Sequence, residues 1–264
     1  MGKIAANKTW VFMDQYSIAS SLSSVELNTT VETPVVTGLS DSGPRRVEGN
    51  YDTDHSFNGF FDGAQYAFDE QVYSWLLDNV AFPSGHKLGV IFGTALTPQG
   101  YPAYEYRSRL SGAPWSAANG AATLLNFSGA GDDAILRGKC ICHDPLVTAP
   151  VAETGYNLGV TGATDYFGVV MRALYGSVWG GGTCTVTVLQ SDDDAVGDPY
   201  TAIDGAFHWH FSADGRVTLI YKGVTKAWKQ ISVSGQTATN TILQVTAGTF
   251  KGVPNLAAAN ISLP

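Results

Sequence analysis

The chain has 264 residues, 44% hydrophobic and 11% aromatic, so it is long and apolar enough to bury a sizeable core. Its 15 Lys and Arg against 23 Asp and Glu give a net charge of −8, which disfavours electrostatic binding of nucleic acid. Only 14% of the residues are charged and 30 are glycine, a composition that excludes intrinsic disorder and collagen-like repeats. An odd number of cysteines, three, favours reduced thiols in a cytosol-like compartment.

The N-terminal residues lack the apolar stretch of a secretory signal, and the longest apolar run, around residues 88–96, is too short to span a bilayer. We therefore expect neither secretion nor a membrane partner.

The first half of the chain predicts strands and one helix. Residues 24–36 alternate in polarity over their first part and are rich in β-branched side chains, which is typical of a strand. The polar residues 37–50 then predict a long hairpin loop, and residues 55–61 a second extended segment. Asp69 can cap a helix over about residues 69–80, where apolar side chains recur at helical spacing: Val72, Trp75, Leu76 and Val80.

Strand-like runs dominate the rest of the chain. They cover residues 87–92, 103–108, 134–142, 166–174, 182–190, 207–211, 216–221, 228–233 and 241–245. The segment 144–155 contains two prolines and little charge, so it predicts a linker. The sequence thus predicts a mainly β protein, a β-sandwich with one helix, divided into residues 1–145 and a second β-rich half, 146–264. Two sandwich-like halves are one organisation that this division allows.

Two short motifs carry the residue types of a metal site. In Cys140-Ile141-Cys142-His143, strand alternation puts both thiols on one face and His143 on the other. In His208-Trp209-His210, two imidazoles share a strand face. Neither motif offers four convergent ligands at a recognisable spacing, and Cys184 is distant in sequence. We expect structural side chains, with no bound metal and no cofactor.

Three groups of carboxylates are further candidates. Ser191-Asp192-Asp193-Asp194 with Gly197-Asp198 has the oxygen ligands that suit Ca²⁺ but lacks the ligand order of an EF-hand, so a solvated loop is expected. Asp132-Asp133 and Asp52 with Asp54 are candidate acid–base pairs for glycoside hydrolysis, but no spacing rule links them. The chain also lacks a phosphate loop, a nucleophile elbow and a dinucleotide fingerprint. An enzyme is therefore not expected.

Two segments carry a family resemblance. The first runs from Met13-Asp14 through residues 24–33 and 37–41 and Arg45-Arg46 to Gly59-Phe60-Phe61-Asp62, just before the predicted helix. It resembles the N-terminal half of bacteriophage major tail proteins, the subunits of the tail tube. The second, residues 182–193, is similar to the Thr- and Val-rich strand ending in Gln-Ser-X-Asp in the later half of such subunits. Together the segments and the strands around them cover about two thirds of the chain.

The resemblance implies a structural subunit that assembles with copies of itself into stacked rings. These rings are either hexameric or pseudo-hexameric trimers. It also implies other tail proteins as partners, a place in the virion after synthesis in the host cytoplasm, and DNA that passes through the lumen without specific binding. Low charge suits surfaces buried between subunits. A carbohydrate-binding β-sandwich module is the alternative, motivated by six Trp and twelve Tyr, and a glycosidase ranks last.

The loop of residues 37–50 is the one segment for which the sequence predicts a contact. It is long and polar, and Arg45 and Arg46 at its tip stand beside Asp41 and Glu48 in an otherwise acidic chain. Long loops in compact domains are usually functional. We expect these four residues to contact the adjacent ring, with the two arginines facing an acidic patch on a neighbouring subunit. A solvated hairpin without a partner is the alternative.

Overall fold

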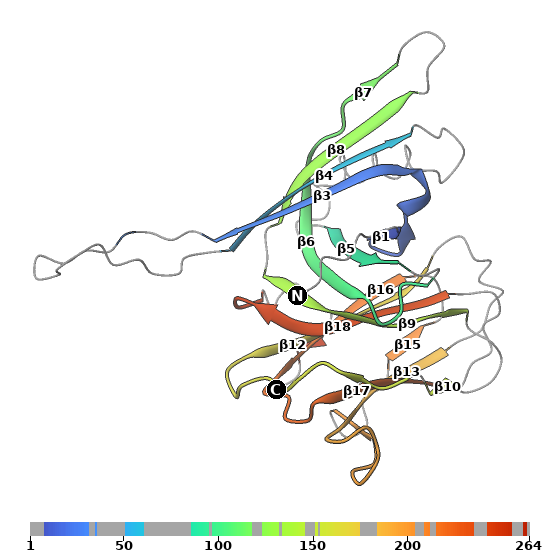
Figure 1. The fold of residues 1–264 in the computed structure, drawn as a ribbon, viewed down its shortest axis with the longest axis vertical. Coiled ribbons are helices and arrows are strands. Elements are labelled where there is room, and N and C mark those ends of the chain that lie inside the picture. The colour runs from blue at the N-terminus through green and yellow to red at the C-terminus, as the bar shows by residue number, and fades with distance from the viewer. Residues whose placement is uncertain are drawn as a thin grey trace, which may run out of the picture. The chain divides into compact units, whose positions relative to one another are not determined.

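A computed structural model describes most of the chain (Figure 1). The described residues are 8–31, 35, 51–60, 86–94, 97–117, 123–131, 134–145, 151–152, 154–174, 184–203, 209–211, 215–234, 242–254 and 261–262. They form two compact units, each assembled from separate stretches of sequence. Unit 1 comprises Met1–Ala19, Lys87–Glu105 and Ile135–Pro264, and unit 2 comprises Ser20–His86 and Tyr106–Ala134.

The larger sheet of unit 1 has the strand order β19-β16-β12-β18-β9-β6-β5-β1-β2. The bounds of these strands are, in chain order, β1 Lys8–Met13, β2 Tyr16–Ser17, β5 His86–Gly93, β6 Pro102–Gly112, β9 Ile135–Pro145, β12 Tyr166–Ala173, β16 Gly215–Lys222, β18 Ile242–Lys251 and β19 Ile261–Ser262. β1 pairs antiparallel with β2 and β5, β9 with β6 and β18, and β12 with β16 and β18, whereas β16 and β19 pair parallel. A short 3₁₀ helix, Ala19–Ser21, follows β2.

The smaller sheet of unit 1 is built around β13 and β17. Its order is β10-β17-β13-β14, with β11 on β17 and β15 on β13. The bounds are β10 Val151–Ala152, β11 Tyr156–Asn157, β13 Cys184–Ser191, β14 Thr201–Ala202, β15 Trp209–Phe211 and β17 Trp228–Ser234. Apolar residues are buried at alternate positions, Cys184, Val186 and Val188 in β13 and Ile231 and Val233 in β17, as expected for strands that cover a core on one face.

The two sheets of unit 1 pack face to face as a sandwich. One buried cluster contains Phe167, Val169 and Met171 of β12, together with neighbours on β16 and β18, and Val186 and Ile231 of the smaller sheet. A second cluster is formed by side chains of β1, β5, β6 and β9 and by the residue after β12. Its members are Phe12, Ile91, Ala103, Cys140 and Leu174. The larger sheet is therefore buried on both faces around β12, which explains why that strand reads as a continuous apolar run.

Unit 2 is one antiparallel sheet. β3 (Leu22–Val31) pairs with β4 (Tyr51–Phe60), which pairs with β8 (Leu124–Gly131). β8 also pairs with the second part of β6 and with β7 (Trp115–Ser116). Buried and exposed residues alternate along β4 and β8, so one face is buried and the other is open to solvent.

The prediction of a mainly β protein is confirmed. The predicted helix over residues 69–80 lies outside the described residues. The two units divide the chain differently from the sequence-based division at residue 145, because segments from both halves build unit 1. The nature of residues 146–264 as a duplicated or an appended unit stays a prediction. No helix in the described part of the chain is long and apolar enough to span a membrane.

Candidate assembly interface

Strand β3 forms an outer edge of the unit 2 sheet. Of the described strands it pairs only with β4, and it is ten residues long. It contains no Pro, Lys or Arg, and Asn28, Thr29 and Thr30 are exposed. The other outermost described strands are two or three residues long: β2, β7, β10, β11, β14, β15 and β19. Long edges without proline or lysine are templates for pairing with another chain, because their N–H and C=O groups are unpaired.

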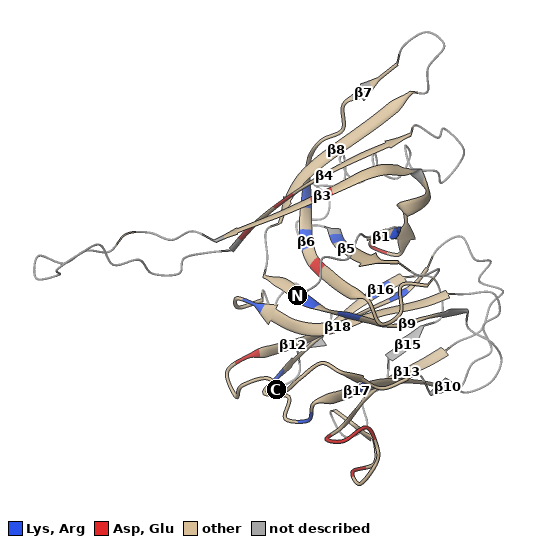
Figure 2. Ribbon diagram, in the orientation of Figure 1, with Lys and Arg blue, Asp and Glu red and all other residues tan. Residues whose placement is uncertain are grey.

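The exposed face of the unit 2 sheet is polar over most of β3 and β4, and the apolar side chains of Phe60 and Leu124 are exposed at one end of it. Asn58 Nδ2 donates a hydrogen bond to Ser24 Oγ at 2.6 Å, and Asn28 Nδ2 donates to Glu26 Oε1 at 3.2 Å. Asp52 and Asp54 of β4 also lie on this face and are exposed. It therefore carries hydroxyl, amide and carboxylate groups over β3 and β4, with acid in excess (Figure 2).

The opposite face of unit 2 buries a histidine. His55 is 3% exposed, and its Nε2 lies 3.1 Å from Ser108 Oγ. A side chain at Gly129 would collide with the imidazole ring, so glycine makes room for it. Nδ1 of His55 has no hydrogen-bond partner, and burial lowers the pKa of His55 to about 4. Ser108 is fully buried, so this serine–histidine pair presents no nucleophile to a substrate.

Unit 1 contains a buried ion pair. Arg172 of β12 donates two hydrogen bonds of 2.6 Å to the two carboxylate oxygens of Glu105 on β6. Both side chains are almost completely buried, at 0% and 1% exposure. The guanidinium also donates to Gln244 Oε1 at 2.9 Å and to the backbone oxygen of Asp14 at 2.6 Å. The Asp14 carboxylate pairs in turn with Arg216 of β16 at 3.1 Å. The network joins β6, β12, β16, β18 and the turn between β1 and β2.

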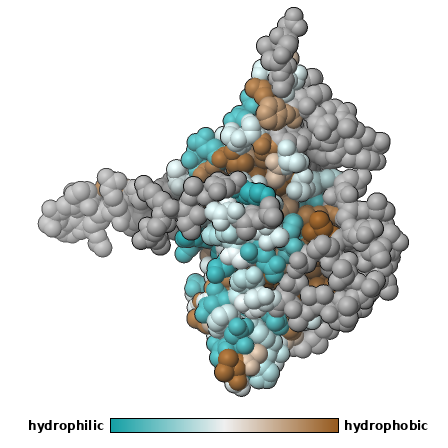
Figure 3. Space-filling model, turned by 45° about the vertical axis from the view of Figure 1, so that its right-hand side comes forward, coloured by the Kyte–Doolittle hydropathy of each residue, from teal (hydrophilic) through white to brown (hydrophobic). Residues whose placement is uncertain are grey.

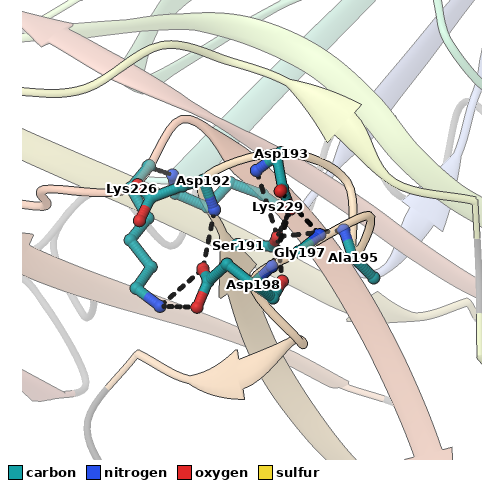
Figure 4. Close-up of polar contacts among 8 residues, drawn as sticks. All are labelled: Ser191, Asp192, Asp193, Ala195, Gly197, Asp198, Lys226 and Lys229. Carbon is teal, nitrogen blue, oxygen red and sulfur yellow. Dashed lines mark hydrogen bonds and ion pairs between the residues drawn. The ribbon is translucent and has the colours of Figure 1, made fainter.

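The acidic loop after β13 is held by its own side chains (Figure 4). Ser191 Oγ donates to the backbone oxygen of Asp198 at 2.6 Å, and Asp193 accepts hydrogen bonds from the N–H groups of Gly197 and Asp198. Lys226 donates to both carboxylate oxygens of Asp198 at 2.8 and 2.7 Å, which lowers the pKa of that carboxyl. The carboxylates thus serve as anchors of an exposed loop, as the sequence predicts.

A buried lysine lies beneath this loop. Lys229 Nζ donates a hydrogen bond to the backbone oxygen of Lys226 and lies 5.2 Å from the centre of the Phe167 ring. Burial lowers the pKa of Lys229 to about 8. Its position ties the turn that carries Lys226 to the sandwich core.

The prediction that Cys140 and Cys142 share one face is wrong. The register of β9 against β18 shifts at Ile141, because Cys142 pairs with Val245 while Cys140 pairs with Thr246. This β-bulge inserts one residue and turns the following side chains over. Cys142 consequently lies in the sandwich cluster, and Cys140 lies in the cluster with Phe12. Burial raises the pKa of Cys140 to about 12, as expected for an unreactive structural thiol.

The remaining sequence candidates are placed only in part. Cys184 is buried in β13, and the described residues contain no group of three His, Cys, Asp or Glu that could hold a metal ion. His208, Asp132 and Asp133 lie outside the described residues, as does the predicted contact loop with Asp41, Arg45, Arg46 and Glu48. The contact of that loop with a neighbouring subunit stays a prediction.

Exposed apolar side chains bear on the carbohydrate-binding alternative, which needs a row of exposed aromatic rings. In the described part of the chain the large exposed apolar residues are Val35, Phe60, Leu124, Val160, Val196 and Val253, with no Trp or Tyr. On the face drawn in Figure 3, hydrophobic residues occur in separate groups among hydrophilic ones. Trp10 is half-buried and stacks on Tyr101, with 6.4 Å between the centres of the two rings. Among the residues whose exposure the structure describes, there is no row of exposed aromatic rings.

Neither a family model nor a curated protein sequence matches the chain. Among solved structures, it is similar in fold to components of phage tails and of phage-like particles. One is the virion of a native gene transfer agent particle, with a TM-score of 0.40 and 17% identity over 50% of this chain and 97% of the other.

Two further structures come from SPP1. Its tail tube has a TM-score of 0.40 and 9% identity, covering 52% of this chain and 80% of the other. Its Dit protein, from a hub adsorption apparatus, has a TM-score of 0.34 and 12% identity, covering 92% of this chain and 99% of the other.

Proposed function

We propose that the chain is a structural subunit of a phage tail tube, which assembles with copies of itself into rings that stack around a DNA channel. The proposal starts from the sequence resemblance of residues 13–62 and 182–193 to tail tube subunits. In the virion its partners would be further copies, in hexameric or pseudo-hexameric trimeric rings, and other tail proteins. It needs no catalytic group and no cofactor.

The observation that carries the proposal is the outer edge of β3. A ten-residue strand that no described strand covers on one side can extend the sheet by main-chain hydrogen bonds to a neighbouring copy. In a closed ring this pairing covers the β3 edge of every copy. In an isolated chain the same edge stays exposed. Most other outer strands are too short to offer an equivalent template.

The exposed face of the unit 2 sheet is suited to a channel wall. Its Asn, Ser and Thr groups are small and polar, and Glu26, Asp52 and Asp54 outnumber the exposed Arg109 on the same face, so its net charge is negative. A ring multiplies this charge by the number of copies. Phosphates would be repelled from such a wall, so DNA could pass without being adsorbed.

The test is a proline scan of β3 read by negative-stain microscopy. The N–H groups of consecutive residues in a strand point to opposite sides, so of Thr29 and Thr30 one donates towards β4 and the other towards the outer edge. Thr29→Pro and Thr30→Pro are therefore matched variants, and the one that keeps the melting temperature has lost only the outer donor.

The proposal predicts rings and tubes from the unmodified protein and none from that variant. Thr→Val at the same position, which keeps the N–H group, should assemble normally. Normal tubes from the stable proline variant would show that the β3 edge is not the assembly contact. An unmodified protein that remains monomeric at millimolar concentration would contradict the proposed function itself.

A further inference from the structure

Three basic side chains lie together at one end of the larger sheet of unit 1, and we call them the basic cluster. Arg137 and Lys139 are two residues apart on β9, so their side chains project from one face. Arg137 lies opposite Thr249 of β18, and Lys251 follows two residues later on the same face. Arg137 and Lys251 are exposed and Lys139 is half-buried. Figure 2 shows the basic residues as blue segments on β9 and at the end of β18.

The basic cluster has no acidic partner among the described residues. None of the ion pairs in that part of the chain includes Arg137, Lys139 or Lys251. Lys139 instead lies 6.0 Å from the centre of the Tyr156 ring. Asp165, which precedes β12 beside the end of β18, accepts a hydrogen bond from the backbone N–H three residues before it. Because like charges on paired strands disfavour each other, the basic cluster favours an anionic partner outside its own copy.

The acidic loop after β13 carries the opposite charge at the same end of unit 1. Asp192, Asp193 and Asp194 are exposed, and Lys226 holds the loop through Asp198. Lys226 lies in the turn from β16 to β17, which joins the two sheets. The end of β16 pairs with the start of β12, and the start of β12 lies beside the end of β18. The acidic loop and the basic cluster therefore share one end of the sandwich.

An exposed valine accompanies each of these two patches. Val196 in the acidic loop is 88% exposed, and Val253, two residues after Lys251, is 77% exposed. A contact between the patches would bury apolar groups together with complementary charges, as protein interfaces do. A nucleic acid would meet the basic cluster with phosphates, which offer no apolar group to the valine. The two patches therefore fit each other better than they fit DNA.

We propose that the acidic loop of one copy docks on the basic cluster of the next copy. This inference rests on the proposed function and adds a contact in unit 1 to that of the β3 edge. Because the two patches differ, the contact is head-to-tail, the kind that generates closed rings. Exposed ion pairs contribute little free energy, so the contact sets the orientation and the rate of association more than the affinity.

Cross-linking of carboxylates directly to amines tests the contact on the full chain. Isotopically labelled and unlabelled copies are mixed, assembled and treated with a carbodiimide, and mass spectrometry identifies the linked peptides. We expect Lys139 or Lys251 to be joined to Asp192 in pairs that combine a labelled with an unlabelled peptide, because such pairs arise only between copies. Among the hydrogen bonds described for the loop, Asp193 and Asp194 are acceptors through their side chains and Asp192 is not.

Lys222 is the matched internal control. It is exposed at the same end of the larger sheet, but it pairs with Tyr166, the neighbour of Phe167 in the sandwich cluster, and so lies on the other face. It should give no mixed-isotope link to the acidic loop. Rings without such links from the basic cluster, or with as many from Lys222, would overturn the proposal and leave the proposed function standing. The absence of any rings would count against the proposed function itself.

A charge exchange gives a second, independent readout. Asp192→Lys and Lys251→Glu, each alone, place like charges across the proposed contact and should slow ring formation by roughly three- to tenfold without changing the circular dichroism spectrum. The double variant restores opposite charges and should assemble near the original rate. A double variant as slow as the product of the two single effects would show that the two side chains do not face each other, and the docking would be wrong.

Discussion

Neutralising one partner of the Arg172–Glu105 pair should be among the most damaging single substitutions in unit 1. Glu105→Gln keeps the size of the side chain but leaves the guanidinium of Arg172 buried without its counter-ion. Removing one partner of a buried ion pair typically costs about 3–5 kcal/mol. Because 1 kcal/mol shifts the melting temperature of a chain of this size by about 2–4 °C, we expect a drop of roughly 6–20 °C.

The double variant Arg172→Met/Glu105→Leu is the matched control. It removes both charges together and loses the guanidinium hydrogen bonds to Gln244 and Asp14, at a cost of about 1–3 kcal/mol. The double variant should therefore be more stable than Glu105→Gln alone. Urea unfolding followed by circular dichroism measures all three proteins. A loss below about 1 kcal/mol for Glu105→Gln, or a double variant that is less stable than Glu105→Gln, would refute the buried-pair reasoning.

Three further predictions concern pH, the contact loop and metal. Because burial depresses the pKa of His55 from 6.5 to about 4, the unfolded chain binds a proton that the folded chain does not, so stability should fall between pH 6.5 and 4. The slope due to this group reaches about 1.4 kcal/mol per pH unit, and His55→Leu should lose that slope in pH-dependent urea unfolding. The double variant Arg45→Glu/Arg46→Glu should block tube growth without changing the circular dichroism spectrum or the melting temperature. Normal tubes from this variant would show that the loop takes no part in assembly. Chelator should leave the melting temperature unchanged, so a shift of several degrees with EDTA would reveal a metal site.

The strands of the second half were largely predictable from the sequence. The runs predicted over residues 166–174, 216–221 and 228–233 correspond to β12, β16 and β17 within one residue at each end. In residues 216–221 and 228–233 apolar residues recur at every second position, which is the spacing of a strand, and residues 166–174 form a short apolar run rich in β-branched and aromatic residues. Several short strands were missed, and so were two longer ones, β1 and β8. β1 has a continuous apolar run without alternation, and β8 contains two glycines beside its apolar residues.

Features that depend on tertiary pairing were not predictable. The bulge at Ile141 arises from the register of β9 against β18, strands about a hundred residues apart, so local alternation placed the two thiols wrongly. Arg172 and Glu105 are likewise 67 residues apart. The only local signal was a charged residue inside the apolar run of β12. A buried arginine needs a carboxylate, but the sequence does not say which of its 23 acidic residues supplies it.

The outer edge of β3 illustrates the same limit for function. The sequence indicated a strand there and resembled tail tube subunits, but whether another strand covers its second side depends on strand order. Only the topology shows that β4 is its one described neighbour.

Negative-stain microscopy of the purified, unmodified chain tests the central claim most directly. Protein concentrated in the absence of other tail components should form rings of uniform diameter that stack into tubes. Particles that remain single subunits at millimolar concentration, by microscopy and light scattering alike, would contradict the proposal that this chain builds a tail tube.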